Sequence, residues 1–409
     1  MVHQMMPINS KPAPRASKSK SVISSWPGFG RWITVLLSVG ILSACGSTAL
    51  RQPPAASASI PVPPSTSPPA STAPSGSGVS IKRGKSRWTP VEWSELPGFE
   101  EDNLYEAWNA WRQSCQRPAA NFAASCADVR RLSIASASEQ RDWLRQHFQP
   151  HRLESLRGES SGLLTGYFEP LLEASRVATA QYSVPIYQPP QGLGQRKPWY
   201  SRQDIDTLPE AQLALRDRVI AYVADPVDVL VLQIQGSGRL RLQQDDGSTR
   251  LIRVAFAATN EQPYRSVGRW LLDQGAVKDA SWPGIRAWLA QNPQRQQELL
   301  WSNPRVVFFR EEPLSTADAA FGPKGAQGVA LTPGRSIAVD PESIPYGTPV
   351  WLVSQGSQTR LQRLVLAQDT GSAVTGAVRA DYFAGWGTEA QELAGRLRQP
   401  LQLWVLWPR

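Results

Sequence analysis

Short apolar segments separated by glycine and proline dominate the chain from Arg305 onward. They read RVVFF, RSIAVD, TPVWLV, LQRLVLAQD and LQLWVLW. Such segments favour short β-strands. Helical patterns do not alternate with them, which disfavours a doubly wound parallel sheet and favours a barrel. The sequence therefore predicts a mainly β fold with accessory helices.

The preceding part of the chain mixes helical and strand patterns. Helices are predicted by EEDNLYEAWNAWRQSC, SEQRDWLRQHF, YRSVGRWLLDQG and PGIRAWLAQN, with Trp108 and Trp111 interpreted as core residues. The stretch from Val227, VDVLVLQIQGSGRLRLQQDDGSTRLIRVAFA, predicts a buried strand, a Gly-Ser-Gly interruption and a hairpin that turns at DDGS.

The positive charge is concentrated at the N-terminus. The formal net charge is +9, and ten Lys or Arg residues precede the first acidic residue, Glu92, so the sequence after Val91 carries about −1. A nucleic-acid interface needs a basic patch on the folded part of a protein. This distribution excludes nucleic acid as a partner and indicates targeting and surface tethering.

Residues 1–45 have the pattern of a lipoprotein signal peptide. A basic segment precedes the apolar run WITVLLSVGILSA, which is shorter than the roughly 20 residues of a membrane span. LSAC resembles a bacterial lipobox, which implies that Cys45 carries lipid and anchors the protein at the periplasmic face of a membrane. Gly46 and Ser47 lack the aspartate associated with inner-membrane retention, which favours the outer membrane. An uncleaved signal anchor is the alternative.

Residues 46–87 are rich in Pro, Ala and Ser and predict a semi-extended linker, with folded sequence from about Trp88. Beyond it, Cys115 and Cys126 are the remaining cysteines. In an oxidising compartment this pair favours a disulfide worth about 3 kcal/mol, with two free buried thiols as the alternative.

The sequence lacks the residues that several kinds of active site require. Only His147 and His151 follow Cys45, which excludes a histidine metal site and a Ser-His-Asp triad, and no CxxC motif provides a zinc site. The Gly-Ser-Gly at 236–238 lacks the lysine and spacing of a phosphate loop. We therefore expect carboxylate chemistry without a metal or a cofactor.

Three aspartates stand at or just beyond the ends of apolar segments: Asp340, Asp369 and Asp381. A carboxyl at a barrel rim is partly desolvated, which raises its pKa, and a second carboxylate raises it further. Such a group can act as an acid near neutral pH. Ordinary turns and a calcium site are the alternatives.

Six motifs in fixed order support a more specific interpretation. They are GLLTGYFEP, VLQIQGSGRL, YRSVGRWL, NPRVVFF, GAQGVALTPGRSIAVDPESIPYGTPVW and AQDTGSAVTGAVRADYFAG. From Trp88 to Arg409 the chain resembles the membrane-bound lytic murein transglycosylase A family, and its three aspartates resemble the 3D signature of that family's C-terminal region.

The resemblance implies a double-psi β-barrel, similar to barwin, with a second β-rich domain inserted and a glycan groove between them. Residues 88–168 and 306–409 would form the catalytic barrel domain with the 3D region. Residues 169–305 would form the inserted substrate-binding domain.

The implied activity is cleavage of the β-1,4 bond between MurNAc and GlcNAc in peptidoglycan, leaving 1,6-anhydro-MurNAc ends, in cell-wall turnover. RADYF matches the family's catalytic acid, which assigns that role to Asp381. QDTG matches the second aspartate, so Asp369 would position or tune Asp381. Relatives can have one residue fewer between the two aspartates, which leaves the conformation of the intervening loop open.

Further motif residues are expected to contact the glycan, although structural roles in bulges or helix starts are open for them. They are Thr165, Gly166, Tyr167, Gln233, Gln235, Gly236, Ser237, Gly238, Tyr264, Arg265, Ser266 and Asp340. Stacking on sugar rings or burial in the barrel is open for Tyr382, Phe383 and Trp386.

The partners implied are peptidoglycan glycan strands and, through the lipid, the membrane, with cell-wall synthesis or division proteins as candidates. Two other functions remain open. One is a peptidoglycan hydrolase that uses both Asp369 and Asp381, and the other is a non-catalytic, expansin-like wall-binding lipoprotein.

Overall fold

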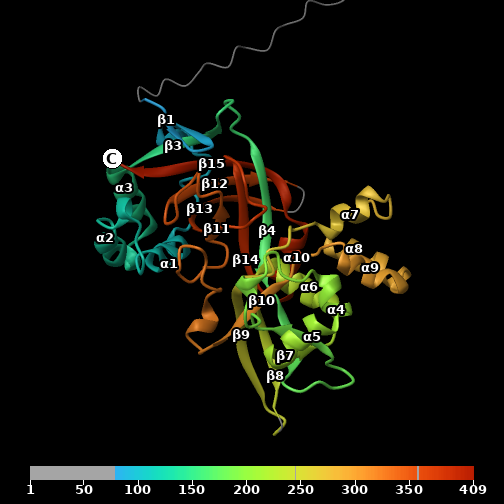
Figure 1. Cartoon of the computed structure of the whole chain (residues 1–409). Coiled ribbons are helices and arrows are strands. Elements are labelled where there is room, and N and C mark those ends of the chain that lie inside the picture. Colours follow the sequence, from blue (N-terminus) through green and yellow to red (C-terminus); the bar gives the residue numbers. More distant parts are fainter. Residues whose placement is uncertain (1–78, 245, 357–358) are drawn as a thin grey trace, which may run out of the picture. The chain divides into compact units, whose positions relative to one another are not determined.

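The computed structural model describes residues 79–409 apart from residues 245, 357 and 358. The predicted signal peptide, Cys45 and the linker up to residue 78 lie outside the described residues. Within the described part, the strands form a nine-stranded and a six-stranded sheet (Figure 1). The prediction of a mainly β fold with accessory helices is confirmed. Over the same residues, none of the helices has the length and apolar character needed to cross a membrane.

Six strands of the larger sheet close into a barrel. In order across the sheet, the nine strands are β1 (Ile81–Arg83), β2 (Ser86–Pro90), β3 (Phe148–Ser155), β15 (Arg398–Pro408), β12 (Pro349–Gln355), β13 (Arg360–Asp369), β11 (Ser336–Val339), β14 (Arg379–Trp386) and β4 (Gly162–Glu169). β15 also pairs with β4, with Arg398 opposite Thr165, which closes the ring from β15 to β4. The β11–β13 and β14–β4 pairs are parallel, and the other four pairs of the ring are antiparallel.

The alternation of side chains along β12 and β13 gives these strands two buried faces. Val350 and Val365 point into the barrel interior. Their neighbours Trp351, Leu364 and Leu366 point outward. They pack against three helices, which are α1 (Tyr105–Ser114), α2 (Cys126–Arg131) and α3 (Ala137–His147). β12 and β13 are therefore buried between the barrel core and this helical layer.

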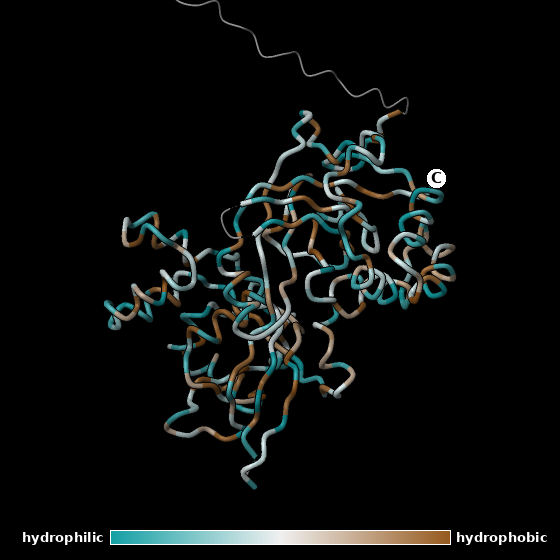
Figure 2. Tube along the Cα trace, turned by 180° about the vertical axis from the view of Figure 1, so that it is seen from behind, coloured by the Kyte–Doolittle hydropathy of each residue, from teal (hydrophilic) through white to brown (hydrophobic). Residues whose placement is uncertain are grey.

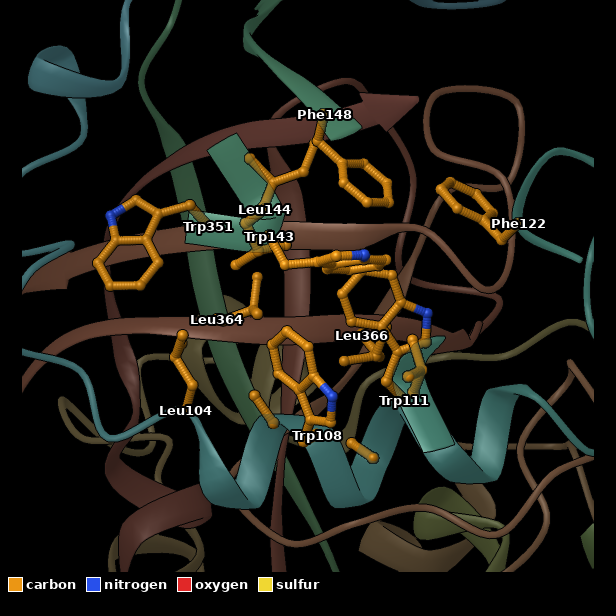
Figure 3. Close-up of a cluster of buried hydrophobic side chains, with 14 of the residues drawn as sticks. Leu104, Trp108, Trp111, Phe122, Trp143, Leu144, Phe148, Trp351, Leu364 and Leu366 are labelled. Atoms are coloured by element: carbon orange, nitrogen blue, oxygen red, sulfur yellow. The ribbon is translucent and has the colours of Figure 1, made fainter. Parts of the chain in front are cut away.

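The helical layer matches the sequence prediction in its core residues. Trp108 and Trp111 of α1 are fully buried, and Figure 3 shows them beside Trp143 of α3. The helices predicted within 100–115 and 138–148 are confirmed as α1 and α3. A disulfide joins Cys115, just after α1, to Cys126 at the start of α2. The alternative of two free thiols is not what the structure shows.

The second sheet carries its own helices. Its strands, in order, are β10 (Val307–Pro313), β9 (Thr249–Thr259), β8 (Ser237–Gln243), β5 (Leu171–Ser175), β7 (Val219–Val223) and β6 (Val184–Tyr187). Its helices are α4 (Arg202–Thr207), α5 (Pro209–Leu215), α6 (Pro226–Gln235), α7 (Val267–Asp273), α8 (Trp282–Gln291) and α9 (Gln296–Trp301). The predicted β8–β9 hairpin and the helices α7 and α8 are confirmed. Figure 2 shows hydrophobic residues along the strands and hydrophilic residues at the hairpin tip.

The strand predicted from Val227 is wrong, because this segment is the helix α6. Asp225 caps the helix by accepting a hydrogen bond from the backbone N–H of Val227 (2.8 Å), and Gly236 ends it with φ 83°. One side of α6 packs on the six-stranded sheet through Leu232, and the other packs on α7, α8 and α9 through Leu230. A helix buried on both sides is apolar all round, so its sequence does not show a one-sided helical period.

Two predicted domain boundaries also differ from the structure. The linker was predicted to extend to residue 87, but β1 and β2 pair with each other and β2 pairs with β3, because the fully buried Trp88 requires its flanking residues in the sheet. Residues from 306 onward were assigned to the barrel, but β10 pairs with β9 along its full length in the six-stranded sheet. The return of the chain to the barrel therefore follows Pro313.

Candidate active site

Asp369 and Asp381 flank a single residue of the barrel. Ala338 of β11 lies opposite Asp369 of β13 on one side and opposite Asp381 of β14 on the other. A bulge at Gln368 sets this register, since the pairing skips that residue. Neighbouring strands lie about 4.8 Å apart, so the two aspartate backbones are roughly 10 Å apart. Both side chains are partly exposed, and the buried Ala338 lies between them in the sheet.

Asp381 is oriented by a residue distant in the sequence. It lies opposite Thr165 in the parallel pair β14–β4, and the Thr165 hydroxyl donates a 2.6 Å hydrogen bond to Asp381 Oδ1. Arg379 Nη2 in turn donates to Thr165 Oγ1 at 2.8 Å. Burial raises the pKa of Asp381, and the Thr165 hydrogen bond and the charge of Arg379 oppose this shift only in part.

Asp369 receives more hydrogen bonds than Asp381. Its Oδ2 accepts from the Tyr167 hydroxyl (3.0 Å), and its Oδ1 accepts from the backbone N–H of Ala326 (2.9 Å). Burial raises the pKa of Asp369, the backbone groups of Thr370 and Ala326 and the Tyr167 hydroxyl oppose the shift, and the charge of Asp381 adds to it. Burial and both aspartates raise the pKa of Tyr167 well above its usual value, so its hydroxyl remains a donor.

The two aspartates differ in the hydrogen bonds that they accept. Hydrogen bonds donated to a carboxylate stabilise its charged form. Asp369 has three such donors, whereas Asp381 has one. A pair of carboxyl groups in such unlike surroundings can provide an acid and a carboxylate at the same pH. The geometry therefore gives the two carboxyl groups unlike hydrogen-bond surroundings, while burial raises the pKa of both.

Asp340, predicted to bind substrate, has a structural role instead. Its carboxylate is 4% exposed and accepts hydrogen bonds from Lys85 Nζ (3.1 Å) and from the backbone N–H groups of Gly376 (2.8 Å) and Glu342 (3.1 Å). Burial raises the pKa of Asp340, but these three hydrogen bonds outweigh it and lower the pKa. Its oxygens are thus occupied in holding the loop that leads to β14.

The predicted residues on and after α6 also have structural partners. Gln233 Oε1 accepts from Arg202 Nη2 (2.6 Å), and Gln235 Oε1 accepts from the backbone N–H of Phe168 (3.0 Å). Gly236 ends the helix, and Ser237 is buried at the start of β8. A Cβ at Gly238 would lie 2.4 Å from the Leu232 side chain. Gln233 joins α6 to α4, and the other residues join α6 to β4 and β8, which is the structural alternative left open above.

Gly166 is required for packing on the barrel. A Cβ at this position would lie 2.8 Å from the Cα of Ala394 in α10 (Gly387–Arg396). Because successive side chains of a strand alternate in direction, Thr165 and Tyr167 point to the opposite face of β4. This face also carries Asp381, so the close packing of α10 leaves the two hydroxyl groups directed at the aspartates.

The segment of Tyr264, Arg265 and Ser266 lies on the six-stranded sheet side of the molecule. Ser266 caps α7, and the backbone N–H of Arg265 donates to Asn303 Oδ1 (3.2 Å). Tyr264 is 37% exposed. Burial raises its pKa, and the charge of Arg305 opposes this shift only in part. Arg305 Nη1 donates to Ser372 Oγ (3.4 Å), in the loop that follows Asp369. All three residues of this motif are exposed.

A buried ion cluster that the sequence analysis missed joins the two sheets. Glu169 is fully buried and accepts from Arg239 Nε (2.7 Å) and Arg253 Nε (2.6 Å). Both arginines also donate to the carbonyl oxygen of Phe321, and the Arg239 guanidinium lies 3.7 Å from the ring centroid of Trp386. The arginines in the otherwise apolar strands 237–243 and 249–259 are the sequence signal that would have indicated it.

The other aromatic residues beside Asp381 are also part of the packing. Tyr382 is 3% exposed and lies in the barrel core, and Phe383 is 1% exposed and packs on Tyr167. Trp386 is occupied by the Arg239 stack. Arg379 and the backbone N–H of Ala326 were not predicted, and no local pattern indicates either one.

Comparison with known proteins gives two family matches. Residues 163–310 match the MltA specific insert domain, and residues 335–407 match the 3D domain. A membrane-bound lytic murein transglycosylase A from Escherichia coli (strain K12) is 34% identical over 254 residues, which is 59% of this chain. The chain spans 64% of the length of this relative.

Solved structures match over more of their length. A lytic transglycosylase, LtgG, of Burkholderia pseudomallei has 44% identity and a TM-score of 0.57, with coverage of 79% of this chain and 95% of that chain. MltA from Neisseria gonorrhoeae has 29% identity and a TM-score of 0.68, with coverage of 81% and 95%.

Proposed function

Since this chain belongs to the membrane-bound lytic murein transglycosylase A family, we propose that it cleaves the β-1,4 bond between MurNAc and GlcNAc in peptidoglycan and leaves 1,6-anhydro-MurNAc ends, in cell-wall turnover. The observation that carries this proposal is the pair of unlike carboxyl groups on either side of Ala338. Asp381 accepts one hydrogen bond and Asp369 accepts three, and in this proposal Asp381 is the acid and Asp369 is the carboxylate.

One acid is sufficient for this reaction. Asp381 gives its proton to the glycosidic oxygen as the bond from that oxygen to C1 of MurNAc breaks. The C6 hydroxyl of the same MurNAc forms the new bond to C1, and its proton passes to the Asp381 carboxylate, which restores the acid. Neither water nor a protein nucleophile is consumed, and the attack gains from being intramolecular. This differs from hydrolysis by a pair of carboxyl groups.

Asp369 serves the same reaction by staying ionised. Its negative charge favours the protonated form of Asp381. It also stabilises the positive charge that develops on the sugar ring in the transition state. The hydrogen bonds from Tyr167 and Ala326 support this role, because they favour the charged form of Asp369.

The proposal extends to the architecture. We propose that the closed six-stranded ring is a double-psi β-barrel and that the six-stranded sheet with its helices is an inserted substrate-binding domain, with the glycan in a groove between them. Two parallel strand pairs within a closed ring support the first part. The contact of Arg305 with Ser372 near Asp369 supports the second. Thr165, Tyr167 and Tyr264 remain the proposed glycan-contacting side chains.

The same proposal includes an outer-membrane lipid anchor at Cys45 facing the periplasm. The lipobox-like LSAC and the words "membrane-bound" in the name of the E. coli relative support it. Labelling cells with a radioactive fatty acid tests the lipid attachment at Cys45. We expect label in the wild-type protein and none in Cys45→Ser, and label retained in both would contradict the assignment.

Digestion of isolated sacculi followed by mass spectrometry tests the activity. A lytic transglycosylase leaves anhydro ends, which lack one water relative to the reducing ends that a hydrolase leaves. Anhydro products support the proposal, and reducing ends would support the two-aspartate hydrolase instead. A wall-binding protein without catalysis would release neither product.

A further inference from the structure

Arg379, Thr165 and Asp381 form a chain of hydrogen bonds beside the proposed reaction centre. The first bond runs from Arg379 Nη2 to Thr165 Oγ1 (2.8 Å), and the second runs from Thr165 Oγ1 to Asp381 Oδ1 (2.6 Å). Arg379 and Asp381 are two residues apart on β14, so their side chains share one face of the strand, and Thr165 lies directly across from Asp381 on β4.

The chemistry of the three groups fixes the direction of this chain. A guanidinium only donates hydrogen bonds, and a threonine hydroxyl has one proton to donate. Thr165 Oγ1 therefore accepts from Arg379. Among the side-chain hydrogen bonds of the described residues, Asp381 Oδ1 is the only acceptor for the Thr165 proton. Oδ1 is thus an acceptor, which leaves Oδ2 to carry the proton of the neutral acid.

The other carboxyl oxygen is open to a ligand. Nothing in the described part of the chain donates a hydrogen bond to Asp381 Oδ2, and this atom is not among the enclosed side-chain atoms that lack a partner. A proton on Oδ2 can reach a bound glycan, whereas a proton on Oδ1 would be held by Thr165.

We propose that Arg379 is a positioning residue that orients the Thr165 hydroxyl and thereby keeps the transferable proton of Asp381 on Oδ2. This inference rests on the proposed function, because it concerns the acid of that reaction. Without the Arg379 donor, the Thr165 hydroxyl is free to rotate and accept a proton from Oδ1. The acid would then spend part of its time with its proton directed away from the substrate.

The charge of Arg379 has a second effect that can be separated from its hydrogen bond. The charged or titratable groups that face Asp381 are Arg379 on its own strand, Tyr167 on β4, Asp369 on β13 and Arg398 on β15, opposite Thr165. The positive charge of Arg379 lowers the pKa of Asp381. Its removal raises that pKa, so the acid stays protonated to a higher pH.

Two variants at position 379, each made with Thr165 and with Thr165→Val, test the proposal. Arg379→Met removes the donor and the charge, and Arg379→Lys keeps both. kcat is measured below the alkaline limb of the pH profile, where Asp381 is protonated, together with KM, sacculus binding and Tm. Wild-type products are identified first, so that a failure of the proposed function, seen as the absence of anhydro ends, is distinct from a failure of this inference.

We expect Arg379→Met to lower kcat roughly tenfold, the effect of one lost positioned hydrogen bond, with KM and sacculus binding unchanged. Arg379→Lys should recover most of the rate. In the Thr165→Val background, Arg379→Met should cause no further loss of kcat, because Thr165→Val has already removed the hydrogen bond to Asp381. The alkaline limb should move to higher pH with Arg379→Met in both backgrounds.

Arg398→Met is the matched control, since it removes a nearby exposed cation that makes no hydrogen bond to Thr165 in the described residues. It should leave kcat at its wild-type value. The inference is overturned if the losses from Arg379→Met and Thr165→Val multiply, or if Arg379→Met raises KM or lowers Tm with kcat unchanged.

Discussion

The hydroxyl of Tyr167 on β4 donates a 3.0 Å hydrogen bond to the carboxylate of Asp369 at the end of β13. This bond links a strand next to the six-stranded sheet with the strand that carries the second aspartate. It places a neutral donor, held in its protonated form by burial and by both aspartates, against the carboxyl group that stays ionised in the proposed mechanism. A substitution of Tyr167 can therefore test the protonation state of Asp369.

Tyr167→Phe should shift the acid limb of the pH profile to higher pH. The hydrogen bond from Tyr167 lowers the pKa of Asp369, so its loss raises that pKa. In the proposed mechanism, activity requires ionised Asp369 and falls as the pH decreases through this pKa. The measurement is kcat/KM against pH on sacculi, with exposed Tyr105→Phe as the control. An unchanged acid limb would show that Asp369 does not set it.

Asp381→Asn should abolish most of the activity. The substitution keeps the shape of the side chain and its acceptor for Thr165 but removes the acid, and loss of a general acid costs about 10²–10⁴-fold in rate. Binding to sacculi should persist, since no contact is lost. Asp217→Asn, at an exposed position, is the control for the removal of one charge. Unchanged release of anhydro products from the Asp381→Asn variant would rule out Asp381 as the acid.

Glu169→Gln should destabilise the protein strongly. Glu169 is fully buried and is the common carboxylate partner of Arg239 and Arg253, whose side chains are 4% and 7% exposed. Removal of one charge from a buried ion cluster costs about 3–5 kcal/mol because the remaining charges are left uncompensated.

Glu173→Gln is the matched control for this prediction. Glu173 pairs with Arg241 on the same sheet, but both side chains are about half exposed, so a loss of only about 0–1 kcal/mol is expected. Urea unfolding gives both values. Equal stability losses for the two variants would mean that burial does not determine the effect.

Replacement of Cys115 and Cys126 by serine should lower the free energy of unfolding by about 3 kcal/mol, the value for a short disulfide-closed loop. Denaturant unfolding with and without a reducing agent measures the effect. The reducing agent should weaken the wild-type protein to a similar degree and leave the double variant unchanged. A wild-type protein that is insensitive to reduction of this bond would contradict the prediction.

Local residue patterns were sufficient to predict much of this protein. The mainly β fold, the helices that contain Trp108 and Trp111, the β8–β9 hairpin and the family motifs around Asp369 and Asp381 are all readable in short windows of sequence. Each of these features depends on neighbours within a few turns or one strand. One-sided burial leaves a periodic trace in such windows.

The tertiary structure decided the contacts between distant parts of the sequence, because a short window of sequence does not contain both partners. The helix α6 is apolar on both sides because two separate layers cover it. Thr165 meets Asp381 across 216 residues of sequence, and Asp340 is satisfied by Lys85 from across 255 residues. These partners depend on the register of paired strands and on the order in which strands join a sheet. The packing of the whole domain determines which strands pair, so no local sequence pattern identifies the partners.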